Sequence, residues 1–321
     1  MHKPLRIGTR GSQLALWQAR AVATRLEAFG FDAELVLIKT SGDRLQSAPI
    51  SEAGTKRLFV KEIEDALLAG EVDAAVHSAK DMPAELPAGL TIAATLPRED
   101  PRDVFVLPAG PAEDDVTAAL ATRPDLRIGT SSIRRTAQLR PRFASATFAP
   151  IRGNVDTRLR KLDAGEYDAL VLAAAGLRRL GFGDRISATI SPHDCVPAPG
   201  QGIVAIELRA DDENSRKTVS RIHDAMAAAA LEAERTVVAA LGGGCQLPLG
   251  ALASVNGSDM EVQAAVCSPD GTRVVRAHAH GPVSAAATLG ERVAARLVRE
   301  GAQEILNAVR QGTESDSRPF D

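Results

Sequence analysis

One short segment brings together the side chains best suited to acid–base chemistry. His77, Lys80 and Asp81 closely follow an expected strand, and Pro83 ends regular structure just beyond them. An aspartate beside a lysine at the carboxyl end of a strand can be held ionised and directed into a cleft. An aspartate in a turn can also cap a backbone amide. Position alone therefore leaves two interpretations of Asp81, a catalytic carboxylate or a turn residue.

Cys245 is the second candidate for chemistry, and it lies in the glycine-rich segment 242–246 (GGGCQ). Structural cysteines usually lie in apolar segments, as Cys267 does within an expected strand. A thiol in a loop can instead be a nucleophile or a covalent attachment point. Cys195 is near His193, but so short a spacing does not aim the two side chains at each other. A lone cysteine is weak support, so a role for Cys245 depends on the other segments.

Arginine is the preferred cation, with 31 arginines to 7 lysines, and arginine grips carboxylates in a bidentate manner. A single surface arginine is usually only solvated. Several of them, however, closely follow expected strands, where ligands of open α/β sheets bind near helix N-termini. The group therefore predicts a bound anion. Its members are Arg10, Arg134, Arg135, Arg152 and Arg158.

Two internal repeats indicate how these residues are positioned. The string LRIGT occurs at residues 5–9 and 126–130, and AGExDAxV follows at 69–76 and 164–171, in the same order. Each first string suits a buried strand that leads into a helix, with Ser12 and Ser132 as helix N-caps. Each second string suits the end of a helix and the start of a strand. We expect two α/β lobes built on one plan, each with a mostly parallel sheet.

The first lobe is longer than the second between its two strings, by about 26 residues. The extra residues fall in a stretch rich in Ser, Gly, Ala and charge, without a clear period. Long structureless loops inside compact domains are often lids. We expect residues 42–57 to form a lid over the cleft.

The last third of the chain has another pattern. A long alanine-rich helix is expected at 218–241, and strands at about 251–255, 260–267 and 273–279 are separated by Asn-Gly and Asp-Gly turns. A helix at about 284–300 would cover this sheet. The pattern predicts a small α+β domain.

Composition narrows the class of protein. A net charge of −3 does not suit a nucleic-acid binder, and no apolar run approaches the ~18 residues of a membrane span. The first eight residues lack the apolar core of a secretory signal. Three widely spaced cysteines suit neither a disulfide framework nor a metal site. We expect a cytoplasmic protein without metal, nucleic-acid or membrane partners.

The motif segments together resemble the porphobilinogen deaminases over nearly the whole chain. Six of them occur in the family's order, and their combination is specific. They are RIGTRGSQLALWQA (6–19), LFVKEIEDALLAGEVDAAVHSAKDMP (58–83), IGTSSIRRTAQL (128–139), IRGNVDTRLRKLD (151–163), PAPGQG (197–202) and LGGGCQLPLG (241–250). The departures, Arg57 and Pro199, do not touch the residues proposed for the chemistry.

The resemblance implies an α/β fold of two lobes like those of periplasmic binding proteins, facing a cleft, and a small α+β C-terminal domain. The expected domains are residues 1–102 plus 203–219 for lobe 1, 103–202 for lobe 2, and 220–311 for the C-terminal domain. Residues 312–321 are expected to be a disordered tail. Two crossings would join the lobes, and the proline- and glycine-rich segment 197–202 suits one of them.

The family joins four porphobilinogen molecules head to tail with loss of ammonia, and water then releases linear hydroxymethylbilane. The resemblance implies a dipyrromethane cofactor, attached through a thioether to Cys245. Asp81 matches the catalytic aspartate, whose carboxylate would accept the pyrrole N–H and stabilise positive charge developing on the ring. The family suggests a monomer.

Each pyrrole brings an acetate and a propionate, and the remaining matched positions would hold these carboxylates. The cations are Arg10, Lys80, Arg134, Arg135, Arg152 and Arg158, and Ser12 and Ser132 would add hydrogen bonds. Lys56 and Lys61 flank the expected lid and would meet incoming porphobilinogen.

Two rival functions use the same residues. A two-lobed anion-binding protein would explain the lobes and the arginines, but not the Cys245 loop. A cysteine hydrolase would pair Cys245 with His77 or His193, and no motif supports such a pair.

Overall fold

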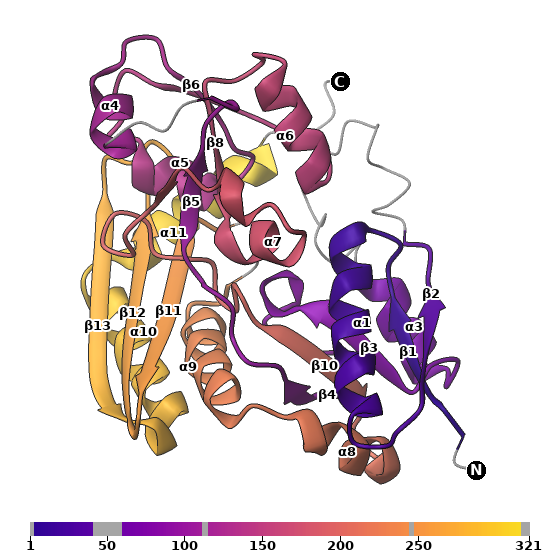
Figure 1. The fold of residues 1–321 in the computed structure, drawn as a ribbon. Coiled ribbons are helices and arrows are strands. Elements are labelled where there is room, and N and C mark those ends of the chain that lie inside the picture. The colour runs from indigo at the N-terminus through magenta and orange to yellow at the C-terminus, as the bar shows by residue number, and fades with distance from the viewer. Residues whose placement is uncertain (1–2, 41–59, 111–114, 244–246, 316–321) are drawn as a thin grey trace, which may run out of the picture.

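The computed structural model describes residues 3–40, 60–110, 115–243 and 247–315, with side chains to residue 311. Three separate sheets organise these residues (Figure 1). The first sheet has the order β2 (Ala33–Leu37), β1 (Leu5–Thr9), β3 (Ala74–Ser78), β10 (Val204–Arg209) and β4 (Leu90–Thr95). Strand β1 is parallel to β2 and β3, whereas β10 is antiparallel to both of its neighbours.

The second sheet repeats this arrangement. Its order is β7 (Thr147–Ala149), β6 (Arg127–Gly129), β8 (Ala169–Ala173), β5 (Asp103–Val106) and β9 (Ala188–Thr189). Again the second strand is parallel to both neighbours and the fourth is antiparallel. The two LRIGT strings therefore occupy equivalent strands, which confirms the duplicated plan.

Apolar faces fix the helices of the first lobe on their sheet. Helix α1 (Gln13–Glu27) buries Ala19, Val22, Ala23 and Leu26, a stripe with helical spacing, against one face. Helix α3 (Lys61–Leu68) covers the other face through Ile63 and Leu67. Helix α8 (Glu213–Val219) follows β10.

The helices of the second lobe are α4 (Val116–Thr122), α5 (Ile133–Leu139), α6 (Val155–Asp163) and α7 (Ala174–Arg179). Helix α5 begins where α1 begins in the first lobe, but it has 7 residues whereas α1 has 15. As expected, both caps are serines: Ser12 accepts from the Ala15 amide at 3.3 Å, and Ser132 from the Arg135 amide at 3.4 Å.

Two crossings join the lobes, and they hydrogen-bond to each other. The amide of Leu96 donates to Val204 at 3.0 Å, and the amide of Glu99 donates to Gly202 at 3.0 Å. Gly202 has a φ of +88°, and a Cβ there would collide with the carbonyl oxygen of Glu99. Only glycine allows so close an approach of the two crossings.

The C-terminal part forms the expected α+β unit. Its antiparallel sheet contains β11 (Leu249–Asn256), β12 (Asp259–Cys267) and β13 (Val274–Pro282), with α9 (Ala225–Ala240), α10 (Ala286–Arg299) and α11 (Ala302–Ser315). The sheet and helices share one apolar core. In the described residues, no helix combines the length and apolar character that a membrane crossing needs.

Two expected boundaries in this part differ from the structure. The helix expected over 218–241 is interrupted, because Asp224 caps a new helix by accepting from the Ala227 amide at 2.7 Å. Helix α11 continues to Ser315, beyond the expected start of the tail at residue 312. Residues 316–321 lie outside the described part, and the domain limits stay a prediction.

Candidate active site

Asp81 lies at the end of a single 3-10 turn, residues 79–81, that directly follows β3. The amide of Ala79 donates to the Ile203 carbonyl at 3.0 Å, which ties this turn to the second crossing. Gly200, with a φ of +73°, presses against the backbone of Ala79, where a Cβ would lie 2.9 Å from the Ala79 carbonyl carbon. The turn that carries Asp81 is thus held by the chain that links the lobes.

A small pocket brings Asp81 together with Arg10 and Ser12. Arg10 and Ser12 come from the loop after β1, and β1 is the direct neighbour of β3 in the sheet. The carboxyl ends of adjacent parallel strands meet at one edge, so residues 71 positions apart converge there. The rest of the lining is Leu14, Ala15, Gln18, Val60, Ile63, Val76, His77 and Ser78.

The sequence analysis assigned no role to Gln18, although its side chain lines this pocket. The Gln18 amide donates to the Ser78 hydroxyl at 2.7 Å, and the side chain is buried. A signal was present, since Gln18 lies on the same face of α1 as Leu14, four residues earlier. The polar group at an otherwise apolar helical position marks the side that faces the site.

His77 is buried beside Glu207, with 3.2 Å between the imidazole Nε2 and a carboxylate oxygen. The other oxygen of Glu207 is buried without a hydrogen-bond partner in the described structure. His77 and Glu207 are therefore paired with each other within the first lobe. The rival pairing of His77 with Cys245 lies outside the described residues.

The second lobe buries Arg134 and Arg135 on one carboxylate, Asp103, which is fully buried. Arg134 donates to Asp103 at 2.7 Å, and Arg135 donates two hydrogen bonds at 2.8 and 3.0 Å. Burial by itself would raise the pKa of Asp103, but the two guanidinium charges outweigh it and hold that pKa well below its usual range. Neither arginine is among the described residues that line the Asp81 pocket.

Arg158 is the least compensated cation of this cluster. It donates to the Gly153 carbonyl at 2.8 Å, and no carboxylate of the described residues pairs with it. Burial, with the nearby charge of Arg135, lowers the pKa of Arg158 to about 10. Arg158 is half-buried, and a cation whose charged form is destabilised in this way is suited to an incoming anion. Arg152, in the loop after β7, is exposed.

Arg179, on α7, is a buried cation that the sequence analysis missed. It donates to the Gly202 carbonyl at 2.6 Å and lies over the Trp17 ring, 5.5 Å from its centre. Burial lowers the pKa of Arg179 to about 10. Arg179 is the last residue of α7, the short helix that directly follows β8, so the strand-end rule points to it only indirectly.

The structure describes some of the predicted lysines and cysteines and leaves others outside its described residues. Lys80 donates to Gln201 at 3.4 Å, and Lys61 is exposed at the start of α3. Lys56, the expected lid of 42–57 and Cys245 lie outside the described residues. Cys195 is buried, and burial raises its pKa to about 12, which does not suit a nucleophilic thiol.

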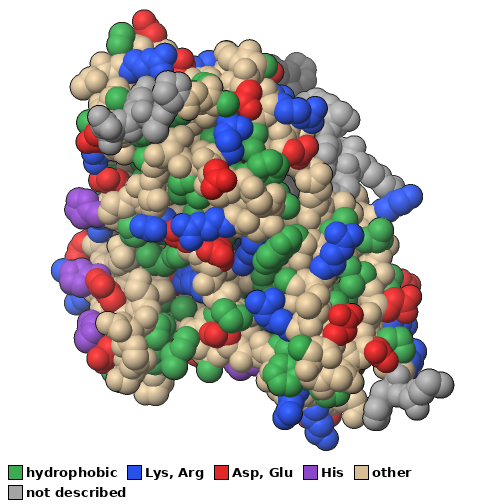
Figure 2. All heavy atoms as spheres, viewed as in Figure 1, with side chains coloured by type: hydrophobic (Ala, Val, Ile, Leu, Met, Phe, Trp, Pro, Cys, Tyr) green, Lys and Arg blue, Asp and Glu red, His purple; other side chains and the backbone are tan. Residues whose placement is uncertain are grey.

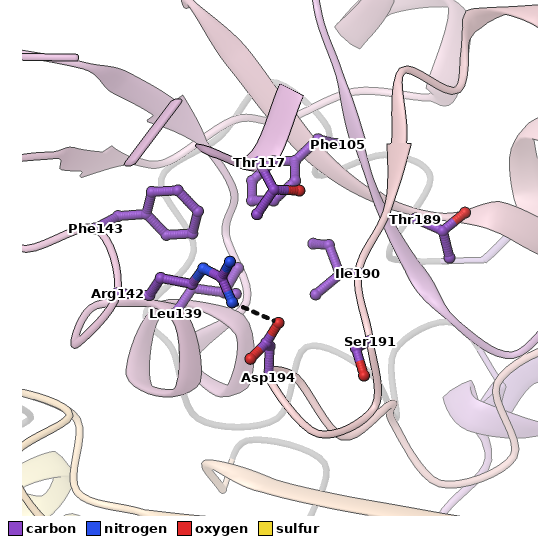
Figure 3. A pocket seen from close by; sticks show the side chains of 9 residues that line it. All are labelled: Phe105, Thr117, Leu139, Arg142, Phe143, Thr189, Ile190, Ser191 and Asp194. Atoms are coloured by element: carbon purple, nitrogen blue, oxygen red, sulfur yellow. Dashed lines mark hydrogen bonds and ion pairs between the residues drawn. The ribbon is translucent and has the colours of Figure 1, made fainter. Parts of the chain in front are cut away.

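A second pocket lies in lobe 2, apart from all the predicted residues (Figure 3). Phe105 and Phe143 meet edge to face in it, and Arg142 pairs with Asp194 at 2.9 Å. Figure 2 shows that lysines and arginines are interspersed with acidic residues on the displayed face. Surface charge alone therefore does not single out the predicted cations.

The two parts of the chain match two family models. Residues 5–217 match the porphobilinogen deaminase dipyrromethane cofactor binding domain, and residues 228–299 match the porphobilinogen deaminase C-terminal domain. Among solved structures, the BvgS VFT2 domain of Bordetella pertussis aligns at a TM-score of 0.40, with 15% identity over 69% of this chain and 87% of that one.

Curated relatives align over almost the full length. The porphobilinogen deaminase of Paraburkholderia phytofirmans is 44% identical over 94% of this chain and 88% of its own. That of Syntrophobacter fumaroxidans is 44% identical over 95% of this chain and 97% of its own. With both family models matched and the strand-end residues in place, this chain belongs to the porphobilinogen deaminase family.

Proposed function

We propose that this chain condenses four porphobilinogen molecules head to tail, with loss of ammonia at each step, into linear hydroxymethylbilane. The family assignment supports the reaction. The structural observation that carries it is the pocket in which Asp81 meets Arg10 and Ser12. A two-lobed anion-binding protein without catalysis is not favoured, since both family models are those of the deaminase.

Asp81 is the residue we propose to act on the reacting atoms. Loss of ammonia from porphobilinogen leaves positive charge that spreads onto the pyrrole nitrogen. A carboxylate that accepts the pyrrole N–H stabilises this charge as it develops. The same carboxylate can take part in the proton transfers of deamination and of rearomatisation. Its anchored turn keeps the group in place without reorganisation.

The buried and half-buried cations of lobe 2 fit a dipyrromethane, which carries several carboxylates. Arg134, Arg135 and Arg158 supply three positive charges, and Asp103 balances only one of them. Burial makes the excess charge costly unless an anion approaches. We propose that Cys245 carries the dipyrromethane through a thioether, and that the bound group supplies the end to which pyrrole units are added.

The other proposed contacts divide between the lobes. Arg10 and Lys80 would bind carboxylates near Asp81, and Arg152 would bind them at the mouth of lobe 2. Ser12 and Ser132 accept helix amides, but each hydroxyl retains a proton that it can donate to a carboxylate. Lys56 and Lys61 would meet incoming substrate at a lid of residues 42–57. We also propose a cytoplasmic monomer.

Intact mass spectrometry of the purified chain tests this function. The wild type should carry a covalent dipyrrole, and Cys245→Ser should be mostly free of it, because a serine oxygen is a poorer nucleophile than a thiolate. Cys267→Ala is the matched control, since Cys267 is buried in β12 and should not alter loading. An active Cys245→Ser enzyme without any covalent pyrrole would overturn the mechanism.

A further inference from the structure

Gln201 lies in the second crossing with a buried side chain, and both ends of its amide are hydrogen-bonded. Its oxygen accepts from the Lys80 ammonium at 3.4 Å. Its nitrogen donates to the Pro101 carbonyl at 2.6 Å and to a carboxylate oxygen of Asp103 at 3.0 Å. The partners fix the orientation of the amide, because an ammonium only donates while a carbonyl and a carboxylate only accept.

These bonds form one continuous chain from the first lobe to the second. Lys80 precedes Asp81 in the turn after β3. Asp103, bonded to Gln201, is also the carboxylate that holds Arg134 and Arg135. The side chain of Gln201 thus links the lysine beside Asp81 to the carboxylate that holds the buried arginine pair.

The backbone around Gln201 is held from two further directions. Its carbonyl accepts from the Arg98 Nε at 3.0 Å. The amide of its neighbour Gly200 donates to the buried Glu234 at 2.6 Å, and Glu234 belongs to α9 of the C-terminal part. The side-chain amide of Gln201 is therefore attached to a backbone that is itself held in place, as a positioning role requires.

We propose that Gln201 is a positioning residue that sets the Lys80 ammonium and the Arg134–Arg135 pair at a matched separation, so that the two lobes present their cations to carboxylates of adjoining pyrrole units. The inference rests on the proposed function of those cations. It assigns no contact with substrate to Gln201. Charge on Lys80 and the arginines would remain without Gln201, but their relative placement would not.

A double-mutant cycle on kcat/KM for porphobilinogen tests the link. Gln201→Met keeps side-chain length but removes all three side-chain hydrogen bonds, and it should lower kcat/KM by about 10-fold while the dipyrrole stays attached. Lys80→Met should then cost at least about fivefold less in the Gln201→Met background than in the wild type. Gln201→Glu should be worse than Gln201→Met, because it sets a second carboxylate against Asp103.

Gln138→Met is the matched control. Gln138 is also buried. Its side-chain oxygen accepts from the Val196 amide at 2.8 Å, and its side-chain nitrogen donates to the Val196 carbonyl at 3.0 Å, just before the second crossing. It should lower the melting temperature, yet its effect on kcat/KM should combine additively with that of Lys80→Met. If Gln201→Met is insoluble, Gln201→Asn, which keeps the amide but not its reach, enters the same cycle.

Additive costs for Gln201 and Lys80 would overturn the inference, as would a Gln201→Glu enzyme of wild-type activity. Either result in protein that carries the dipyrrole and makes hydroxymethylbilane leaves the proposed function intact. A wild-type chain with neither property would instead contradict the proposed function itself.

Discussion

The two lobes have the same strand order but bury different side chains at one equivalent position. The antiparallel strand of lobe 1 begins at Val204, opposite Ser78 at the end of β3. The equivalent strand of lobe 2 begins at Asp103, opposite Ala173 at the end of β8. One position is thus apolar in the first lobe and a fully buried carboxylate in the second.

The helices that follow β1 and β6 also differ between the lobes. After the capping Ser12, α1 continues with Gln13 and Leu14, whereas α5 continues after Ser132 with Ile133 and two arginines. The buried Asp103 compensates arginines that lobe 1 does not have. The shared backbone therefore sets the equivalent positions, and a few side chains decide whether such a position is apolar or holds a buried carboxylate paired with two arginines.

The largest expected effect comes from making lobe 2 resemble lobe 1 at this position. Asp103→Leu leaves two buried guanidinium groups uncompensated, so the free energy of unfolding should fall by about 3–5 kcal/mol. Urea unfolding measures it. Asp163→Ala, which breaks the exposed pair with Arg185, should cost only about 0–1 kcal/mol. Equal losses in the two variants would show that Asp103 is not the counter-charge.

The next effect concerns the carboxylate of lobe 1. Asp81→Asn keeps the shape of the side chain and removes its charge, so turnover should fall by about 10²-fold or more. Steady-state rates on protein of known dipyrrole content measure it. Asp65→Asn, on the exposed side of α3, should have normal turnover. An Asp81→Asn enzyme within a few-fold of wild type would remove the catalytic assignment.

Arg158 should separate function from stability. Removing a charge-assisted carboxylate contact costs roughly 1.5–3 kcal/mol of binding, so Arg158→Met should reduce the fraction of chains loaded with dipyrrole. Because burial lowers its folded pKa to about 10, the charge of Arg158 opposes folding at neutral pH. The unloaded variant should therefore unfold no more easily than the unloaded wild type. Arg160→Met, at an exposed site on the same helix, should load normally.

The smallest effect appears only in acid. The folded pKa of Asp103 lies below its unfolded value of about 3.9. Its stabilisation is therefore complete above that unfolded pKa and is lost as pH falls toward the folded pKa. Between about pH 4 and pH 2, the wild type should lose more stability than Asp103→Asn does. Parallel stability curves over this range would count against the ionised Asp103.

The sequence was informative where chemistry follows local pattern. The paired strings placed β1 and β6 in equivalent strands, and the strand-end rule brought Arg10 to the Asp81 pocket. Asp103 gave no such signal, because its role depends on arginines 31 and 32 residues away. Gln201 was noted only as part of a glycine-rich crossing, and its amide acquires meaning from three partners distant in the chain. Contacts between residues so far apart in the chain produce no periodic pattern in the sequence.

The late place of β10 in the chain, inside the sheet of lobe 1, also sets an order of assembly during synthesis. The sheet of lobe 2 has all five strands once residue 189 has been made. Lobe 1 lacks an interior strand until Val204–Arg209 emerges, so β3 and β4 wait with unpaired edges while the whole second lobe is translated. Such edges are templates for wrong pairing. The N-terminal lobe, although translated first, is therefore the lobe whose strand edges stay unpaired longest.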